Sequence, residues 1–138
     1  MLNHKKHLNS HLLKWYSQNK RDLPWRKLYK NNLPNPYYIF VSEYMLQQTT
    51  VNTVNLRFIE FINKWPSLNR LAKATEPQIL KFWSGLGYYS RARNLLKAAK
   101  IINKNYNAKI PNNYDILIKL PGIGDYTAKA IMGIAYNK

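Results

Sequence analysis

The chain has 138 residues, of which 22 are Lys or Arg and 6 are Asp or Glu, so its formal net charge at pH 7 is +16. It contains no Cys, which excludes a disulfide framework, a thiolate nucleophile and a cysteine-ligated zinc or iron–sulfur site held by this chain alone. No apolar run approaches the ~20 residues of a membrane span, and no signal-peptide core follows the N-terminus. We therefore expect one basic domain in the cytoplasm, with no membrane partner.

The positive charge and the aromatic residues together favour a polyanionic partner. A field of this sign attracts nucleic acid most directly. The sequence has 11 Tyr and 4 Trp among its basic residues, and such rings can stack on bases or wedge between them. The alternative is a basic surface without a function, of the kind that a Lys-rich and Asn-rich proteome produces. Charge alone does not decide between the two.

Apolar residues recur at helical spacing and Gly and Pro are confined to the joints, so the sequence predicts an all-α fold. A first helix carries an apolar stripe from Leu8 to Tyr16 and ends before Pro24. After a breaker-rich loop at 31–36, Ser42 is the expected N-cap of a helix that runs through Val54. Further helices are expected at 56–65, 68–74, 76–85, 89–106, 114–120 and 125–135.

Three of these later helices have clear sequence signals. Ser67 is expected to cap the helix at 68–74, and Thr75 the next helix, where Pro77 lies in the first turn and its missing N–H costs nothing. The longest helix, 89–106, should bury its apolar side chains and turn its basic residues outward. The expected buried residues are Leu95, Leu96, Ala99 and Ile102, and the expected outward ones are Arg91, Arg93, Lys97, Lys100 and Lys104.

The turn Leu-Pro-Gly-Ile-Gly at Leu120–Gly124 joins the last two predicted helices and is the most specific local signal. Gly122 and Gly124 permit positive φ on both sides of Ile123, so the turn can be tight while Ile123 packs into the core. Backbone N–H groups at the start of the following helix would then face an anion such as a DNA phosphate. An ordinary helix-to-helix corner is the alternative, and Asp125 would repel a phosphate unless it turns to cap the helix.

Glu43 is the only charged residue between Lys30 and Arg57, and its neighbours on both sides are apolar. A carboxyl group in an apolar wall is desolvated, so its pKa rises and it can hold a proton near neutral pH, as a general acid must. The alternative is a first-turn carboxylate that favours the helix dipole or pairs with Arg26. Spacing alone leaves both explanations open.

Two further segments carry side chains that suit DNA. The run Gln-Gln-Thr-Thr at 47–50 could reach base edges or fill a gap in a duplex, although such runs are also typical of a solvated helix face. The glycine-framed loop at 85–89 could direct Leu86 or Tyr88 into a groove, or pack its tyrosines on the core. Residues that suit phosphate contacts follow just beyond this loop, at Ser90, Arg91 and Arg93.

Four stretches, in this order, resemble signatures of the helix-hairpin-helix DNA glycosylases, and within them of the MutY-type adenine DNA glycosylases. They are residues 23–26, 41–49, 85–93 and 120–128, and the resemblance extends from about residue 10 to the end of the chain. It implies an all-α helical bundle, like a six-helix barrel, with a helix-hairpin-helix motif. Residues 10–138 would then form the catalytic region and residues 1–9 a basic N-terminal tip.

The resemblance implies an A/G-specific, monofunctional DNA N-glycosylase of base excision repair, which works as a monomer in the cytoplasm at the bacterial nucleoid. Such enzymes bind double-stranded DNA, flip out an adenine mispaired with 8-oxoguanine or guanine and hydrolyse its N-glycosidic bond. Endonuclease III-type relatives, which also nick the strand, carry a Schiff-base lysine where this chain has Tyr126, and lack the counterpart of Glu43. That glycosylase/lyase class and a non-catalytic helix-hairpin-helix DNA-binding module are the two alternatives.

The resemblance also assigns a role to each matching residue. Glu43 corresponds to the catalytic acid, which protonates N7 of adenine so that the C1′–N9 bond can break through an oxocarbenium-like state. Tyr126 matches a tyrosine of the catalytic pocket, and Arg26 a residue that binds the flipped base. The residues matched to DNA contacts are Gln48, Thr49, Tyr88, Gly122 and Gly124, with Tyr88 as the side chain wedged beside 8-oxoguanine.

The chain departs from the family pattern at its C-terminus. Family members carry a downstream loop with an essential aspartate, four cysteines for a [4Fe–4S] cluster and a lesion-reading domain, and this sequence stops before them at Lys138. Neither Asp115 nor Asp125 matches the missing aspartate. We therefore expect an N-terminal fragment of a longer enzyme, or alternatively a split or decayed gene product, with impaired catalysis and no metal or cofactor of its own.

Overall fold

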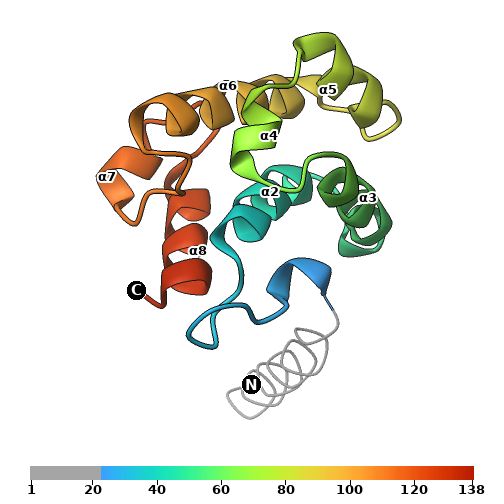
Figure 1. Cartoon of the computed structure of the whole chain (residues 1–138). Coiled ribbons are helices and arrows are strands. Elements are labelled where there is room, and N and C mark those ends of the chain that lie inside the picture. Colours follow the sequence, from blue (N-terminus) through green and yellow to red (C-terminus); the bar gives the residue numbers. More distant parts are fainter. Residues whose placement is uncertain (1–22) are drawn as a thin grey trace, which may run out of the picture.

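The computed structural model describes residues 23–138, so the predicted first helix from Leu8 to Tyr16 and the basic tip at 1–9 lie outside the described residues. The described part holds one short 3-10 helix and seven α-helices without a β-strand, which confirms the predicted all-α class (Figure 1). None of these helices is long and apolar enough to cross a membrane. The elements are η1 (Pro24–Arg26), α2 (Pro36–Leu46), α3 (Val51–Lys64), α4 (Leu68–Ala72), α5 (Glu76–Trp83), α6 (Tyr89–Asn105), α7 (Tyr114–Leu117) and α8 (Asp125–Tyr136).

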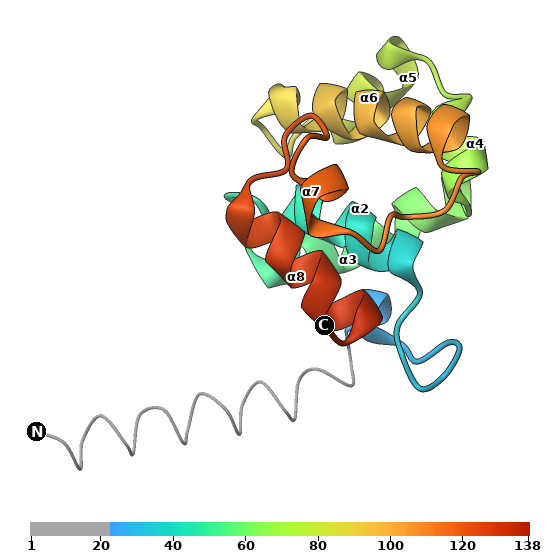
Figure 2. The same ribbon diagram turned by 90° about the vertical axis from the view of Figure 1, so that its left-hand side faces the viewer.

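Helix α2 lies at the centre of the arrangement. It packs against α8 on one side and α3 on the other, and it also contacts η1 and α6 (Figures 1 and 2). Ile39, Phe40 and Val41 are three consecutive residues with no exposed surface, so the helix is buried around most of its circumference. A charged side chain on such a helix loses much of its contact with water.

Helix α2 begins earlier than the sequence predicts. Pro36 occupies its first turn, and the Asn35 side chain accepts a hydrogen bond from the backbone N–H two residues on, at 2.9 Å. Ser42 is therefore not the N-cap, and its buried hydroxyl donates to a carbonyl of the preceding turn instead. The predicted helix through Val54 is in fact two helices, because Thr50 caps the start of α3.

The predictions for α4, α5 and α6 are largely confirmed. The Ser67 side chain accepts a hydrogen bond from the Arg70 N–H at 3.3 Å. Thr75 and Gln78 form a complete capping box at the start of α5, with each side chain bound to the other residue's backbone N–H. All four residues predicted to face inward from α6 are buried: Leu95, Leu96, Ala99 and Ile102.

Helices α7 and α8 form a hairpin around the turn at 120–124. Gly122 has φ +79°, a conformation that favours glycine, and Ile123 is only 5% exposed, as the sequence predicts. Gly124 has φ −95° and ψ −174°, which is extended backbone that any residue adopts. The prediction of positive φ on both sides of Ile123 is therefore wrong for Gly124, because the chain has already reversed at Gly122.

Candidate active site

The hairpin turn docks on the C-terminal end of α2. The Tyr44 hydroxyl donates to the Pro121 carbonyl at 2.5 Å, and the Gln47 side-chain amide donates to the Gly122 carbonyl at 3.3 Å. Helix α6 closes the junction, since a Cβ added at Gly122 would lie 2.9 Å from the Cβ of Asn94. Three segments distant in sequence thus meet at one point, and one end of α2 becomes the natural place for a site.

Glu43 lies on α2 immediately before Tyr44 and is partly buried. Burial raises the pKa of Glu43 from its ordinary value of 4.5 to about 7, and the positive charge of Arg26 opposes this rise without cancelling it. A carboxyl group with a pKa of about 7 is roughly half protonated at pH 7, where an exposed one has almost no proton to donate. The setting of Glu43 therefore suits a general acid at neutral pH.

The alternative explanation of Glu43 as a first-turn carboxylate is wrong, because α2 begins at Pro36 and the helix dipole gives no advantage so far from its N-terminus. Arg26 does act electrostatically on Glu43 from the short helix η1. A cavity of about 320 Å³ opens beside Arg26, between the segment that follows η1 and the C-terminal part of α8. Arg26 therefore both lines this cavity and acts through its charge on Glu43.

The other predicted site residues fall into two groups. Gln48 and Thr49 lie in the turn between α2 and α3, and Tyr88 lies in the loop between α5 and α6, both near the C-terminal end of α2 where Gly122 docks. Gln48 and Tyr88 both have left-handed backbone, with φ +59° and +50°, and Tyr88 is 58% exposed. Tyr126, on the first turn of α8, is 80% exposed, so the protein does not enclose it with Glu43.

The prediction that Arg91 points outward and suits a phosphate contact is wrong. It is only 5% exposed, and its guanidinium donates to the Met45 carbonyl at 2.7 Å and the Gly87 carbonyl at 3.2 Å. It is therefore neither an outward residue nor a phosphate contact, because peptide carbonyls have replaced water around its charge. Arg93, two residues on, is exposed and pairs with Glu76 at 3.0 Å. Nothing in the local sequence separates these two arginines.

Asp125 does not cap α8, but the negative charge of its side chain is balanced by neighbouring groups. Its carboxylate accepts a hydrogen bond from the Tyr114 hydroxyl and lies 3.2 Å from the Lys129 ammonium. These two partners, Tyr114 first, lower the pKa of Asp125. The negative charge beside the hairpin is thus held by α7 and α8 themselves, which weakens the objection to an anion at this turn.

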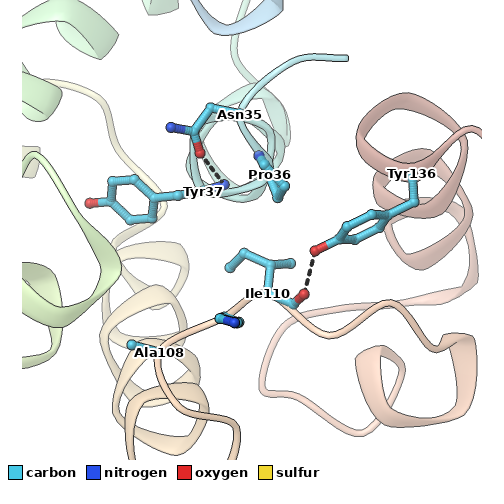
Figure 3. Close-up of a pocket in the computed structure, with 7 residues that line it drawn as sticks. Asn35, Pro36, Tyr37, Ala108, Ile110 and Tyr136 are labelled. Atoms are coloured by element: carbon cyan, nitrogen blue, oxygen red, sulfur yellow. Dashed lines mark hydrogen bonds between the residues drawn. The ribbon is translucent and has the colours of Figure 1, made fainter. Parts of the chain in front are cut away.

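A second cavity, of about 270 Å³, lies at the opposite, N-terminal end of α2 (Figure 3). Its walls come from Asn35 to Tyr37, the loop before α7 and the last turn of α8, and the Tyr136 hydroxyl joins two of them by donating to the Ile110 carbonyl. No carboxylate lines this cavity, and none of the predicted site residues does. This cavity is therefore separate from the candidate active site, which contains Glu43 in the C-terminal half of α2.

The donor groups of this chain do not fit the iron–sulfur cluster that the resemblance implies for longer family members. Thiolates are the usual ligands of such clusters, and the sequence has no Cys. Among residues 23–138, no three His, Cys, Asp or Glu side chains gather as metal ligands. The cluster would need ligands that this chain does not supply.

Comparison with known proteins agrees with this arrangement. Residues 41–136, from α2 to the end of α8, match the family described as HhH-GPD superfamily base excision DNA repair protein. The chain therefore belongs to the HhH-GPD superfamily. This confirms the predicted resemblance to helix-hairpin-helix DNA glycosylases.

Similar proteins place the chain more closely within that superfamily. It is 45% identical to the adenine DNA glycosylase of Buchnera aphidicola subsp. Baizongia pistaciae over 91% of its length, and 45% identical to that of Mus musculus over 94%. It covers only 35% and 26% of those two proteins. A thermostable thymine-DNA glycosylase of known structure is 29% identical, with a TM-score of 0.79 over 96% of this chain and 59% of the other. The first two matches confirm the resemblance to the adenine glycosylases.

Proposed function

We propose that this chain is the DNA-binding and proton-donating part of an adenine DNA glycosylase of base excision repair. Its substrate would be double-stranded DNA in which adenine is mispaired with 8-oxoguanine or guanine. The observation that carries the proposal is Glu43, whose pKa is raised to about 7 on the same helix that receives the hairpin turn. The names of the two adenine glycosylase relatives support the choice of base.

Binding begins with charge. The net charge of +16 attracts the duplex, and backbone N–H groups at the start of α8 would hold a phosphate beside the hairpin. Extrusion of a base costs a few kcal/mol, so side chains that fill the vacated stack lower the cost of the flipped state. Tyr88 and Gln48 are exposed at the same end of α2 and suit this task.

The chemical step follows from the protonated Glu43. The carboxyl donates its proton to N7 of the extruded adenine, and the electron pair of the C1′–N9 bond leaves with the base. Water then adds to C1′ of the cationic sugar, and the Glu43 carboxylate takes up the proton that the water loses. Arg26, whose charge acts on Glu43, binds the extruded base, and the exposed Tyr126 contacts it. The products are free adenine and an abasic site.

A single-turnover excision assay tests this function. The substrate is a duplex with one 8-oxoguanine:adenine pair, and alkali converts each abasic site to a strand break. We expect Glu43→Gln to lower the rate by at least about 100-fold, the usual contribution of a general acid. Glu60→Gln, which removes an exposed carboxylate from α3, is the matched control and should keep the wild-type rate.

Three results would contradict the proposal. Equal rates for the wild type and Glu43→Gln would remove Glu43 from the reaction. Strand breaks without alkali would favour the endonuclease III-type glycosylase/lyase. Salt-dependent duplex binding with no excised base in any variant would reduce the chain to a DNA-binding module.

A further inference from the structure

The buried Arg91 is bound to both segments that carry the proposed DNA contacts. Its contacts extend to the last turn of α2 and to the loop between α5 and α6. Nη1 donates to the carbonyls of Tyr44 (3.4 Å), Met45 (2.7 Å) and Gln47, and Nη2 to those of Leu86 (3.3 Å) and Gly87 (3.2 Å). One side chain therefore joins the turn that carries Gln48 and Thr49 to the loop that carries Tyr88.

The shape of a guanidinium is what allows this connection. It is a planar group with five N–H donors in a fixed fork, so its two ends can bind different segments at once. The last carbonyls of α2 have no partner within the helix, and a buried positive charge also complements the negative end of the helix dipole. A lysine ammonium could satisfy one of these segments but could not span both.

The guanidinium also contacts two aromatic rings, one at the end of α5 and one in the loop. Its central carbon lies 5.5 Å from the ring centroid of Tyr88 and 5.3 Å from that of Trp83. The indole N–H of Trp83 donates to the Gly87 carbonyl at 3.1 Å, so Arg91 and Trp83 hold the same peptide. Cation–π contacts of this kind orient a ring as well as stabilise it.

Other contacts also hold the loop, since Arg57 donates to the Ser84 carbonyl at 3.3 Å and the Leu86 N–H donates to the Trp83 carbonyl at 3.0 Å. Gly85 and Gly87 have φ +91° and +73°, and a Cβ built at either position would meet no atom within 4 Å. Tyr88 itself is left-handed with φ +50°, which is unfavourable for a residue with a side chain. Arg91 therefore contributes to the position of the half-exposed Tyr88 ring, which it contacts directly.

We propose that Arg91 is a positioning residue that fixes Tyr88 relative to the turn at 47–49, so that the two segments enter a duplex together and distinguish a mispair from a matched pair. The inference rests on the proposed function. Arg91 is buried beneath both segments and touches no DNA, so it acts entirely through Tyr88 and the turn.

The test is a binding experiment with the full chain. Dissociation constants are measured at several salt concentrations for a duplex with one 8-oxoguanine:adenine pair and for the same duplex with a guanine:cytosine pair. A 2-aminopurine next to the pair reports unstacking by fluorescence. Arg91→Lys keeps the charge and loses the fork. Arg70→Lys is the matched control, since the same substitution falls on an exposed arginine of α4 that has no proposed DNA contact.

We expect the preference of Arg91→Lys for the mispaired duplex, measured as the ratio of the two dissociation constants, to be about tenfold smaller than that of the wild type. The 2-aminopurine signal that reports unstacking should also be lost. Its affinity for the matched duplex and its salt dependence should stay within about twofold of the wild type, because phosphate contacts dominate both. Arg70→Lys should keep the preference. The double variant Arg91→Lys/Tyr88→Leu should lose less than the sum of the losses of the two single variants, because Arg91 acts in part through Tyr88.

A second variant keeps the test decisive if Arg91→Lys does not fold. Gly87→Ala strains the loop at φ +73° without a clash, and it should lose the same preference with Arg91 in place. Preference retained in Arg91→Lys or Gly87→Ala, or fully additive losses in the double variant, would overturn the inference. A wild-type chain without any preference would instead contradict the proposed function, and the inference with it.

Discussion

The raised pKa of Glu43 predicts how the stability of the protein changes with pH. The carboxyl has an ordinary pKa of 4.5 in the unfolded chain and a pKa of about 7 in the folded one. The folded state therefore holds this proton more tightly, so the contribution of Glu43 is complete below pH 4.5 and is lost as the pH rises through 7. At about 1.4 kcal/mol for each pKa unit, about 3 kcal/mol of unfolding free energy is lost across this window.

Glu43→Gln is the perturbation that isolates this effect, because glutamine keeps the size of the side chain and cannot ionise. At pH 4 the variant and the wild type should be about equally stable, and at pH 8 the variant should be more stable by about 3 kcal/mol. Urea unfolding followed by circular dichroism, repeated from pH 4 to 8, measures the difference. Glu60→Gln is the control, and its difference from the wild type should stay constant.

Two outcomes would refute the reasoning. If the stabilities of the wild type and Glu43→Gln run parallel with pH, Glu43 is not desolvated by its surroundings. If the free energy of unfolding of the wild type instead rises relative to that of the variant as the pH rises, the attraction to Arg26 outweighs burial. The carboxylate is then the favoured form. In either case Glu43 would be a poor proton donor at pH 7.

Four further substitutions test the fold. Gly122→Ala should destabilise the protein by about 2 kcal/mol, because its Cβ would lie 2.9 Å from Asn94 at φ +79°, whereas Gly124→Ala, with open space around it, should change thermal unfolding by less than about 0.5 kcal/mol. Equal effects at the two glycines would contradict the described turn. Thr75→Ala should cost about 1 kcal/mol in urea unfolding through loss of the capping box, and an unchanged midpoint would argue against that cap. Tyr44→Phe removes the 2.5 Å bond to the hairpin and should cost about 1 kcal/mol, with faster amide exchange in the turn as the second readout.

The parts of the fold that the sequence predicted correctly depend on local interactions. Ser67 and Thr75 form caps within three residues of themselves, and the turn at 120–124 needs glycine at Gly122 for its own backbone. The apolar face of α6 is read from spacing alone. The same local reasoning identified Glu43 as a charge in an apolar wall, and the structure gives it the expected direction of pKa change.

The parts that were wrong depend on choices between competing signals or on contacts distant in the sequence. Asn35 followed by Pro36 is a stronger helix start than Ser42, and only the packed helix shows which cap is used. Gly124 carries the same residue type as Gly122 but needs no positive φ. Arg91 is buried because the C-terminal end of α2 and the loop at 85–88 pack over it. The sequence of α6 alone does not show this packing.

The structure also changes the meaning of the positive charge. Arg57 donates to the Ser84 carbonyl at 3.3 Å at the end of α5, and Lys100 donates to the Ala72 carbonyl at 2.6 Å at the end of α4. Arg91 does the same for α2. Carbonyls at helix C-termini lack partners within the helix, so these three cations stabilise the bundle. Part of the positive charge that suggests DNA binding is therefore structural. The other Lys and Arg side chains are the ones expected to contact a duplex.

The most direct test of the account is an NMR titration of the Glu43 carboxyl carbon. The sequence has only three glutamates, at positions 43, 60 and 76, so the side-chain carboxyl signals are few and Glu43→Gln assigns the one of interest. The account predicts a midpoint near pH 7 for Glu43. A midpoint near 4.5 would mean that the carboxylate is ionised at neutral pH, and the proposed proton donor would not exist.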